Sequence, residues 1–333
     1  MTRARGVALI TALLISALAG AVATNLAWDS ALDARRTMVL LFRDQAVQVA
    51  VGSEGWVRTI LRDDLASSTN DHLDEIWATE IPALPIDSEA VQGQIWGNIE
   101  DLQGRFNINN LIGPNGEVDE AAFEQFERLL AALGLDPRIA GATADWLDAD
   151  QQELIPDGAE DPLYTGYTPA YRTANRSISN VTELAAVEGI DQASFEILLP
   201  HVVALPGRTA VNVNTASIPV LQSLGPNITI GDAEGLVSAR QEGGFVDYSD
   251  IFAPLVDPRL VQWISESSSF FQLKAVVQID TVRVSLFTTM VRNPQTGDVT
   301  PILRSLGTIL HGRVCCHTPW SNARRTGRVD CRR

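Results

Sequence analysis

The sequence predicts an α+β fold in which one long N-terminal helix packs on an antiparallel sheet that a large all-α insertion interrupts. Three observations support this prediction. Apolar residues recur at helical spacing, without a proline, from the N-terminal segment to about Leu65. Alternation of apolar and polar residues, which is typical of strands, occurs in 86–110 and again in 271–306. The pattern between these regions is helical, so the order of elements indicates one αβ domain divided by an insertion.

The N-terminal segment is long and apolar enough to cross a membrane. Arg3 and Arg5 precede Gly6, and no charged residue follows until Asp29. The apolar run 7–27 has 21 residues, and a helix of that length spans about 30 Å of hydrocarbon. Because basic residues precede the run and acidic residues follow it, the body of the chain is predicted to be exported.

Two interpretations of this segment compete. Ala21-Val22-Ala23 is a small-x-small pattern that would suit a cleaved secretory signal. Beyond the run, however, apolar residues continue at helical spacing: Met38, Leu41, Phe42, Val49, Trp56, Ile60 and Leu61. A signal peptide normally gives way to a loop, whereas this pattern predicts one helix that continues from the apolar run. We therefore favour a retained membrane anchor.

The leader resembles that of the type IV pilin and type II secretion pseudopilin class. Arg3-Ala4-Arg5-Gly6 precedes the apolar run Val7-Ala8-Leu9-Ile10-Thr11. The resemblance implies that a prepilin peptidase cleaves between Gly6 and Val7, so that Val7 becomes the new N-terminus. Most members carry glutamate at the fifth mature position, where it is thought to pair with the terminal amine of a neighbouring subunit. This chain has Thr11 there, and a subunit at the filament tip would not need that pairing.

The strands and helices expected further along follow from the same periodicities. Strands are predicted at 94–99, 104–109, 271–279, 282–291 and 299–306, and helices at 121–133 and 139–147. Glu117 and Asp119 are expected to mark a helix start. The predicted organisation is a leader at 1–6, a membrane helix at 7–27, a first αβ part at 28–110, the insertion at 111–268, a second αβ part at 269–307 and a tail at 308–333.

The insertion contains two related repeats, at about 175–205 and 211–252. Each begins with polar residues that could cap a helix, Ser179 or Asn180 in the first and Asn214 or Thr215 in the second. The second repeat resembles helix-hairpin-helix DNA-binding modules. Its turn at 225–231 is too long for such a module, and Arg240 is its only basic residue. The formal net charge of -16 would also repel a phosphate backbone. A DNA-binding module on an exported protein is therefore kept only as an alternative, and no nucleic-acid partner is expected.

Taken together, these features resemble the K-type minor pseudopilins of type II secretion. The matching segments are 100–111, 145–150, 158–161 and 171–175, and the resemblance covers about residues 1–306. It implies a single-pass inner-membrane protein with its body in the periplasm. It also implies that the chain joins the I- and J-type minor pseudopilins and the major pseudopilin, caps the pseudopilus and helps to initiate its assembly for export of folded proteins. The equivalent minor pilin of a type IV pilus system is the other alternative.

A cluster of seven acids between Asp145 and Asp161 is the candidate metal site. Carboxylates crowded on a loop suit calcium, which takes six to eight oxygen ligands, and the absence of nearby His or Cys argues against zinc. From composition alone, a solvated acidic loop is the simpler interpretation. The family resemblance implies calcium binding in the insertion. The predicted ligands are Asp148, Asp150, Asp157, Glu160 and Asp161, with Glu153 as a further candidate.

No catalytic arrangement is visible in the sequence. His72, His201, His311 and His317 lack metal-ligand spacing, and no Gly-x-Ser-x-Gly or phosphate-cradling loop occurs. Trp56, Trp77, Trp96 and Trp146 are predicted to belong to the core. We therefore expect an assembly subunit and not an enzyme.

The C-terminal tail differs from the rest of the chain. Residues 311–333 hold six arginines, one acid and all three cysteines, which are Cys315, Cys316 and Cys331. The first 310 residues thus carry 19 basic and 40 acidic residues and no cysteine, so no disulfide supports the folded part. A disordered tail, a disulfide-bearing appendage and the product of a frameshift are the three interpretations of 308–333.

Overall fold

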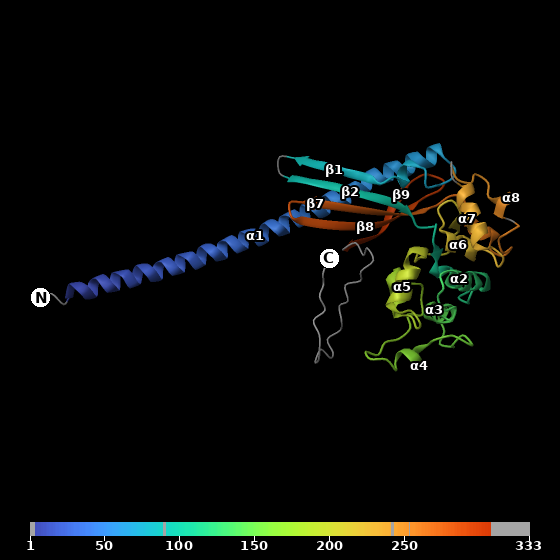
Figure 1. Cartoon of the computed structure of the whole chain (residues 1–333), viewed down its shortest axis with the longest axis horizontal. Helices are drawn as coiled ribbons and strands as arrows, with labels where there is room; N and C mark the ends of the chain where they lie inside the picture. The colour runs from blue at the N-terminus through green and yellow to red at the C-terminus, as the bar shows by residue number, and fades with distance from the viewer. Residues whose placement is uncertain (1–3, 89–90, 241–242, 253, 308–333) are drawn as a thin grey trace.

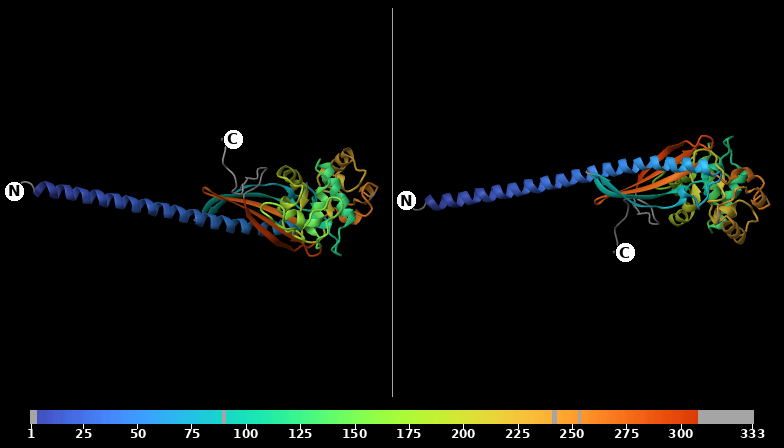
Figure 2. Two further views of the ribbon diagram at one scale, coloured as in Figure 1. Left: turned by 90° about the horizontal axis from the view of Figure 1, so that it is seen from below. Right: turned by 90° about the horizontal axis from the view of Figure 1, so that it is seen from above.

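In a computed structural model, a single helix of 64 residues, α1 (Ala4–Ser67), leads into a body made of a sheet and a cluster of helices. The structure describes residues 4–88, 91–240, 243–252 and 254–307. The N-terminal part of α1 projects far from the body, and the helical cluster lies at the end of the sheet away from the N-terminus (Figures 1 and 2). The tail predicted at 308–333 lies outside the described residues.

The predicted continuous N-terminal helix is confirmed. Large apolar side chains of α1 from Leu9 to Leu41 are exposed, and burial begins at Phe42. From there Ala46, Ala50, Val57 and Leu61 face the sheet, at spacings of four, seven and four residues, which place side chains on one helix face. Packing against the sheet therefore holds only the part of α1 from Phe42 onward.

The sheet is antiparallel and has five strands in the order β1-β2-β7-β8-β9. The strands are β1 (Ile81–Ser88), β2 (Val91–Asp101), β7 (Phe270–Ile279), β8 (Val282–Arg292) and β9 (Val299–Gly307). α1 covers one face, mainly over β7 and β8. The central pair, β2 and β7, runs from Gly93 opposite Ile279 to Asp101 opposite Phe271, so the insertion leaves and re-enters at adjacent strand ends. This topology explains how a long insertion is accommodated without breaking the sheet.

Side chains from α1 and the sheet form two small cores. Val57 and Leu61 pack with Trp77, Phe271 and Met290 near the insertion, where the Trp77 and Phe271 rings meet edge to face at 5.3 Å. Nearer the exposed N-terminal part of α1, Ala46 and Ala50 pack with Ile95, Val277 and Leu286. Small residues on α1 let the helix approach the pleated surface closely.

Three of the predicted strands match β7, β8 and β9 to within one residue, and 94–99 lies inside β2. The segment 104–109 is not part of the sheet. Only β3 (Phe106–Asn107) is extended, and it pairs in parallel with β4 (Val202–Val203) inside the insertion. The chain turns there because the Asn107 side chain accepts a hydrogen bond from the Asn109 N–H and caps a 3-10 turn at Ile108–Leu111.

The insertion is mainly helical and has its own core. Its helices are α2 (Glu120–Ala132), α3 (Ile139–Leu147), α4 (Asp161–Tyr164), α5 (Gln192–Leu198), α6 (Ile218–Ser223), α7 (Ile230–Ala239) and α8 (Ser249–Phe252). It also holds β3–β4 and a second parallel pair, β5 (Val211–Asn212) with β6 (Ile264–Ser265), so it is not purely helical as predicted. Asp119 caps α2, as the sequence suggested.

Two expectations about single residues are wrong. Trp56 is 55% exposed, because it borders an open hollow between α1 and strands β1 and β2, whereas Trp77 and Trp146 are buried as predicted. Asn214 and Thr215 do not cap α6, whose N-cap is Ser217. Asn214 instead bonds the backbone N–H and carbonyl of Phe245, which ties the two halves of the second repeat together.

A buried polar junction joins the insertion to α1 and the sheet. Arg292, at the end of β8, is only 2% exposed. It donates to the Leu61 carbonyl at 3.1 Å, to Asp64 at 3.0 Å, to both Asp71 oxygens at 2.5 and 2.6 Å and to the Ser268 carbonyl at 2.9 Å. One guanidinium therefore connects the end of α1, the following loop and the start of β7.

The junction continues into the insertion through Asp101 at the end of β2. Its Oδ2 accepts hydrogen bonds from Asn212 at 3.1 Å, Thr215 at 2.5 Å and Ser268 at 2.7 Å. Burial raises the pKa of Asp101 to about 6. Because buried polar groups are costly unless every partner is in place, this network favours one placement of the insertion on the sheet.

Replacing Arg292 with methionine is expected to destabilise the body strongly. Arg292→Met would leave the Asp64 and Asp71 carboxylates buried without their cation, and breaking such a pair costs about 3–5 kcal/mol. Urea unfolding of the full chain in detergent, followed by tryptophan fluorescence, measures the loss. The matched control is Arg283→Met on the same strand, where the side chain is exposed and a loss below about 1 kcal/mol is expected. Equal losses in the two variants would contradict the role given to Arg292.

Candidate functional site

The acidic loop between α3 and α4 is held tightly against α3. Asp145, buried on α3, accepts hydrogen bonds from the backbone N–H groups of Leu154, at 3.1 Å, and Ala159, at 2.7 Å. A Cβ on Gly158 would collide with Asp145 and with the Leu154 backbone, and a Cβ on Gly141 would lie 2.6 Å from the Asp157 carbonyl oxygen. The loop can pack this closely only because both positions are glycine.

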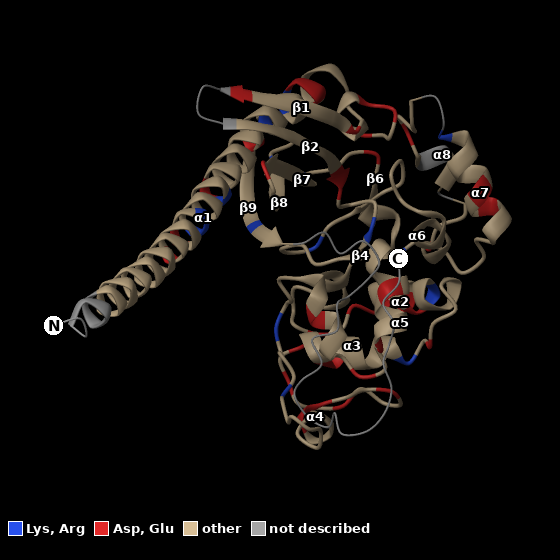
Figure 3. Cartoon of the chain, turned by 60° about the vertical axis from the view of Figure 1, so that its left-hand side comes forward, with Lys and Arg blue, Asp and Glu red and all other residues tan. Residues whose placement is uncertain are grey.

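Three carboxylates meet where the loop begins and ends. Asp148 is the C-cap of α3, Asp150 follows two residues later, and Glu160 is the N-cap of α4. Each offers an oxygen within 4.8 Å of the others. Asp148 and Glu160 are buried, and Asp150 is exposed. Figure 3 shows acidic residues along the loops around α4.

The buried oxygens of this group lack donors. Oδ1 of Asp148 and Oε1 of Glu160 are buried and accept no hydrogen bond from the part of the chain that the structure describes. The same holds for Oδ1 of Asn175, whose Nδ2 donates to the Asp150 carbonyl at 2.7 Å. Unpaired buried acceptors cost free energy, and a cation is the partner that could satisfy several acceptor-only groups together. The residues present therefore fit a hard metal ion.

The charges of the three carboxylates also favour a bound cation. Burial, and then the charges of Asp150 and Asp145, raise the pKa of Asp148 to about 6. Burial, and then the charges of Asp145 and Asp148, raise the pKa of Glu160 to about 7, although the Thr173 hydroxyl donates to it. The ionised carboxylates thus repel one another, and a divalent cation between them would reverse that repulsion.

The structure does not bring the other predicted ligands into this group. Asp161 accepts hydrogen bonds from the Thr173 N–H and hydroxyl, both at 3.1 Å, and lies 3.6 Å from Arg172. Glu153 is exposed, and Asp157 lines a groove beside α2. Sequence reasoning also missed Asn175, although it ends the segment 171–175 that carried part of the family resemblance. Its left-handed backbone, with φ of 46°, is the geometric sign of a special position.

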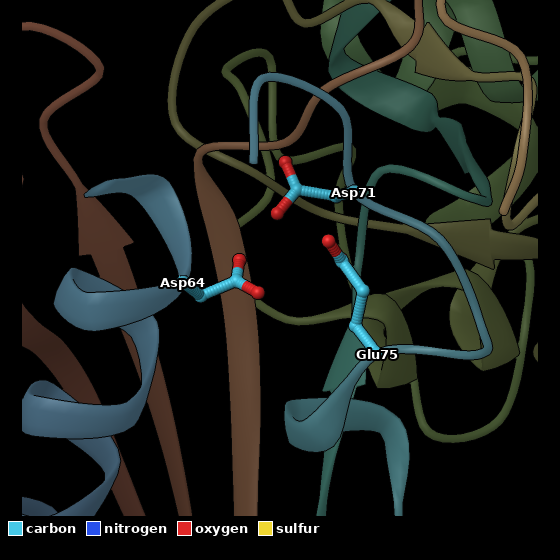
Figure 4. A group of neighbouring side chains, drawn as sticks. All are labelled: Asp64, Asp71 and Glu75. Carbon is cyan, nitrogen blue, oxygen red and sulfur yellow. The ribbon is translucent and has the colours of Figure 1, made fainter. Parts of the chain in front are cut away.

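A second acidic group, at the junction, differs in its donors. The carboxylates of Asp64, Asp71 and Glu75 point toward one another, with oxygens within 4.8 Å (Figure 4). Arg292 donates to Asp64 and Asp71, and the Trp77 indole donates to Glu75 at 2.7 Å. These oxygens already have N–H partners, so the geometry singles out the Asp148 group as the metal candidate.

The N-terminal sites lie in α1. Gly6, Val7 and Thr11 fall within the helix, and the side chains of residues 1–8 are outside the described part. From Leu9 onward α1 is long and apolar enough to cross a membrane: its most apolar 18-residue window has mean hydropathy 2.0, and none of that window is buried against the body. Cleavage between Gly6 and Val7 stays a prediction.

Arg240, the only basic residue of the second repeat, forms hydrogen bonds with the backbone of that repeat. Its Nη1 donates to the carbonyl oxygens of Val213 at 2.9 Å and Ala216 at 2.6 Å. The guanidinium therefore fastens the end of α7 to the turn before α6. The basic residue of the second repeat thus has a structural role within the insertion.

Comparison with known proteins decides the family. Two models of type II secretion system (T2SS) protein K match residues 104–207 and 211–258. Type II secretion system protein K of Pseudomonas aeruginosa is 40% identical over 255 residues, which cover 74% of this chain and 75% of that protein. This chain belongs to the type II secretion system protein K family. The predicted K-type resemblance is thereby confirmed.

Other members of the protein K family give the same result. The Klebsiella pneumoniae protein is 35% identical over 272 residues, covering 78% of this chain and 81% of that protein. The Aeromonas hydrophila protein is 30% identical over 314 residues, covering 87% and 93%. The first family model includes the whole acidic loop and Asn175.

A solved structure confirms the fold. The chain matches one in the crystal structure of the GspK–GspI–GspJ complex from the enterotoxigenic Escherichia coli type 2 secretion system, with a TM-score of 0.71 and 24% identity. The match covers 82% of this chain and 99% of that chain. At this identity the likeness concerns the fold, and it agrees with the predicted pilin-like α+β architecture.

Proposed function

We propose that this protein K is the minor pseudopilin that caps the type II pseudopilus and helps to initiate its assembly, in company with I- and J-type subunits and without catalysing a reaction. The observation that carries the proposal is the geometry of α1 and the insertion. α1 runs unbroken from its apolar segment into the body, and the insertion lies at the far end of the sheet (Figure 1). The crystallised E. coli GspK, GspI and GspJ form a complex, which supports the choice of partners.

This geometry suits a terminal position in a filament. Subunits whose α1 helices pack side by side would stack their bodies along the helix direction. The insertion of this chain occupies the end where the next body would stack, so it would block growth on that side. Thr11 supports the same position, because it offers no carboxylate to the terminal amine of a further subunit.

The proposal places α1 in the inner membrane with the body in the periplasm. We expect mass spectrometry of the membrane-extracted chain to find an N-terminus at Val7, produced by prepilin peptidase. A strain without that peptidase should yield the uncleaved leader. An N-terminus at Thr24, after the Ala21-Val22-Ala23 pattern, would instead indicate an ordinary cleaved signal and would remove the membrane anchor.

Tip location can be tested directly. Full-length chain in detergent is expected to co-purify with the I- and J-type subunits of its own system. In a strain that overproduces the major pseudopilin, gold-labelled antibody against the insertion should mark one end of each pseudopilus. Antibody against the major pseudopilin is the control and should mark the whole length. Label from the insertion along the whole filament would contradict the capping role.

We further propose that the acidic loop binds calcium through Asp148, Asp150 and Glu160, with the Asn175 carbonyl oxygen and backbone oxygens completing the ligands. The unpaired buried oxygens described above support this choice. A bound calcium ion would neutralise the repelling carboxylates and hold the end of α3 to the start of α4. Its role would be structural, because it would fix the shape of the insertion.

Thermal unfolding with calcium and with a chelator tests this site. A ligand that binds the folded state at a hundredfold excess over Kd adds about 2.7 kcal/mol, so the midpoint should rise by several degrees. Asp148→Asn and Glu160→Gln should lose that rise. Glu153→Gln changes the same charge in the same loop but lies outside the group, and it should keep the rise. A wild-type midpoint that calcium leaves unchanged would reject the site.

A further inference from the structure

A groove beside α2 lies entirely within the insertion. It has a volume of about 300 Å³ and is lined by Val118, Phe123 and Glu127 on one side and by 154–157 of the acidic loop on the other. We name it the α2 groove. Its floor is largely apolar, and its volume lies at the lower end of the range for ligand pockets. A hollow of this size suits one or two side chains and not a folded domain.

Two carboxylates of the α2 groove have no hydrogen-bond or ion-pair partner among the described residues. Glu127 and Asp157 are half-buried, and neither accepts a hydrogen bond or forms an ion pair within the described residues. Arg138 also lines the groove, but its guanidinium donates to both oxygens of Asp136 at 2.6 to 3.1 Å. Burial, and then the charge of Glu124, raise the pKa of Glu127. Arg128 and Arg138 act on these carboxylates only through their charge at a distance. The groove therefore combines an apolar lining with carboxylates that no cation pairs directly.

The rim presents a large apolar side chain in a fixed position. Ile155 is 90% exposed. Its neighbour Leu154 donates its backbone N–H to Asp145, so the loop cannot easily turn Ile155 inward. A partner that covers this exposed isoleucine and the apolar hollow beside it would remove apolar surface from water, which lowers the free energy of the complex.

We propose that the α2 groove is a docking site for a segment of a partner protein that presents an arginine or lysine next to an apolar residue. Both basic side chains carry an apolar stem with a cationic end, which matches an apolar floor with carboxylates at its edge. The negative charge of the chain, -16 overall, would attract such a segment and repel an acidic one. Helix α2, whose residues line the groove, belongs to the insertion at the end of the sheet away from the N-terminus (Figure 1), so a capped filament would present the groove outward. In this respect the proposal rests on the capping function.

Ligand-detected saturation-transfer NMR with full-length chain in detergent tests the chemistry. The probes are N-acetyl-Leu-Arg-amide, N-acetyl-Leu-Glu-amide and N-acetyl-Ser-Arg-amide. Only the first should receive strong saturation, because it alone offers both the cation and the apolar side chain. Glu127→Gln removes one charge-assisted contact and should lower the affinity of this probe about tenfold. Ile155→Ser should lower it by removing the apolar rim.

The matched control is Glu234→Gln, which makes the same charge change at an exposed position on α7. It should leave binding unchanged, and unfolding midpoints establish that each variant is folded. Equal binding of the Leu-Glu probe, an equal loss in Glu234→Gln, or no binding of the Leu-Arg probe to the folded wild type would overturn the proposal. Because these readouts use neither filament assembly nor calcium, their failure is distinguishable from failure of the capping or the calcium proposal.

Discussion

The placement of the insertion depends on one buried guanidinium. Arg292 joins α1, the loop after it and the start of β7, and its partner Asp71 lies 221 residues away in the sequence. Asp64, Asp71 and Glu75 bring more negative charge than this one cation offsets. Accordingly, burial and the charges of Glu75 and Asp71 raise the pKa of Asp64 to about 7. Such a cluster is stable only when each partner is in place, so it couples the C-terminal end of α1 to the insertion.

The two acidic groups show that carboxylates gathered in space can serve different purposes. At the junction, N–H donors from Arg292, Ser268 and Trp77 satisfy the oxygens, and the group acts as a joint. In the loop between α3 and α4, oxygens of Asp148 and Glu160 are buried without donors. Asp145 explains why the loop keeps this shape, because it anchors the backbone on both sides of Gly158. The supply of donors, and not the number of acids, separates a structural network from a metal candidate.

The parts of the subunit follow one another from the N-terminus to the far end of the insertion. The apolar part of α1 leads to a rigid sheet, the junction holds the insertion on that sheet, and the acidic loop shapes one side of the insertion. The α2 groove uses the same loop as a wall, so the shape of the loop and the properties of the groove are linked. The contacts of the junction therefore connect α1 to the part of the insertion that carries the groove.

The sequence by itself determined the elements whose signal is local. The unbroken helix, its apolar run and strands β7 to β9 follow from periodicity and length, and the family follows from motifs in a fixed order. Only the tertiary structure decided which acids meet, because that depends on how Asp145 holds the loop. It brings Asp148, Asp150 and Glu160 together and leaves Glu153, Asp157 and Asp161 outside the group. It also places the Asn175 amide against the Asp150 backbone. It also leaves Trp56 exposed, and it directs the Asn214 side chain to the Phe245 backbone and not to the start of a helix. Side-chain contacts between residues far apart in the sequence arise from packing, and no local pattern encodes them.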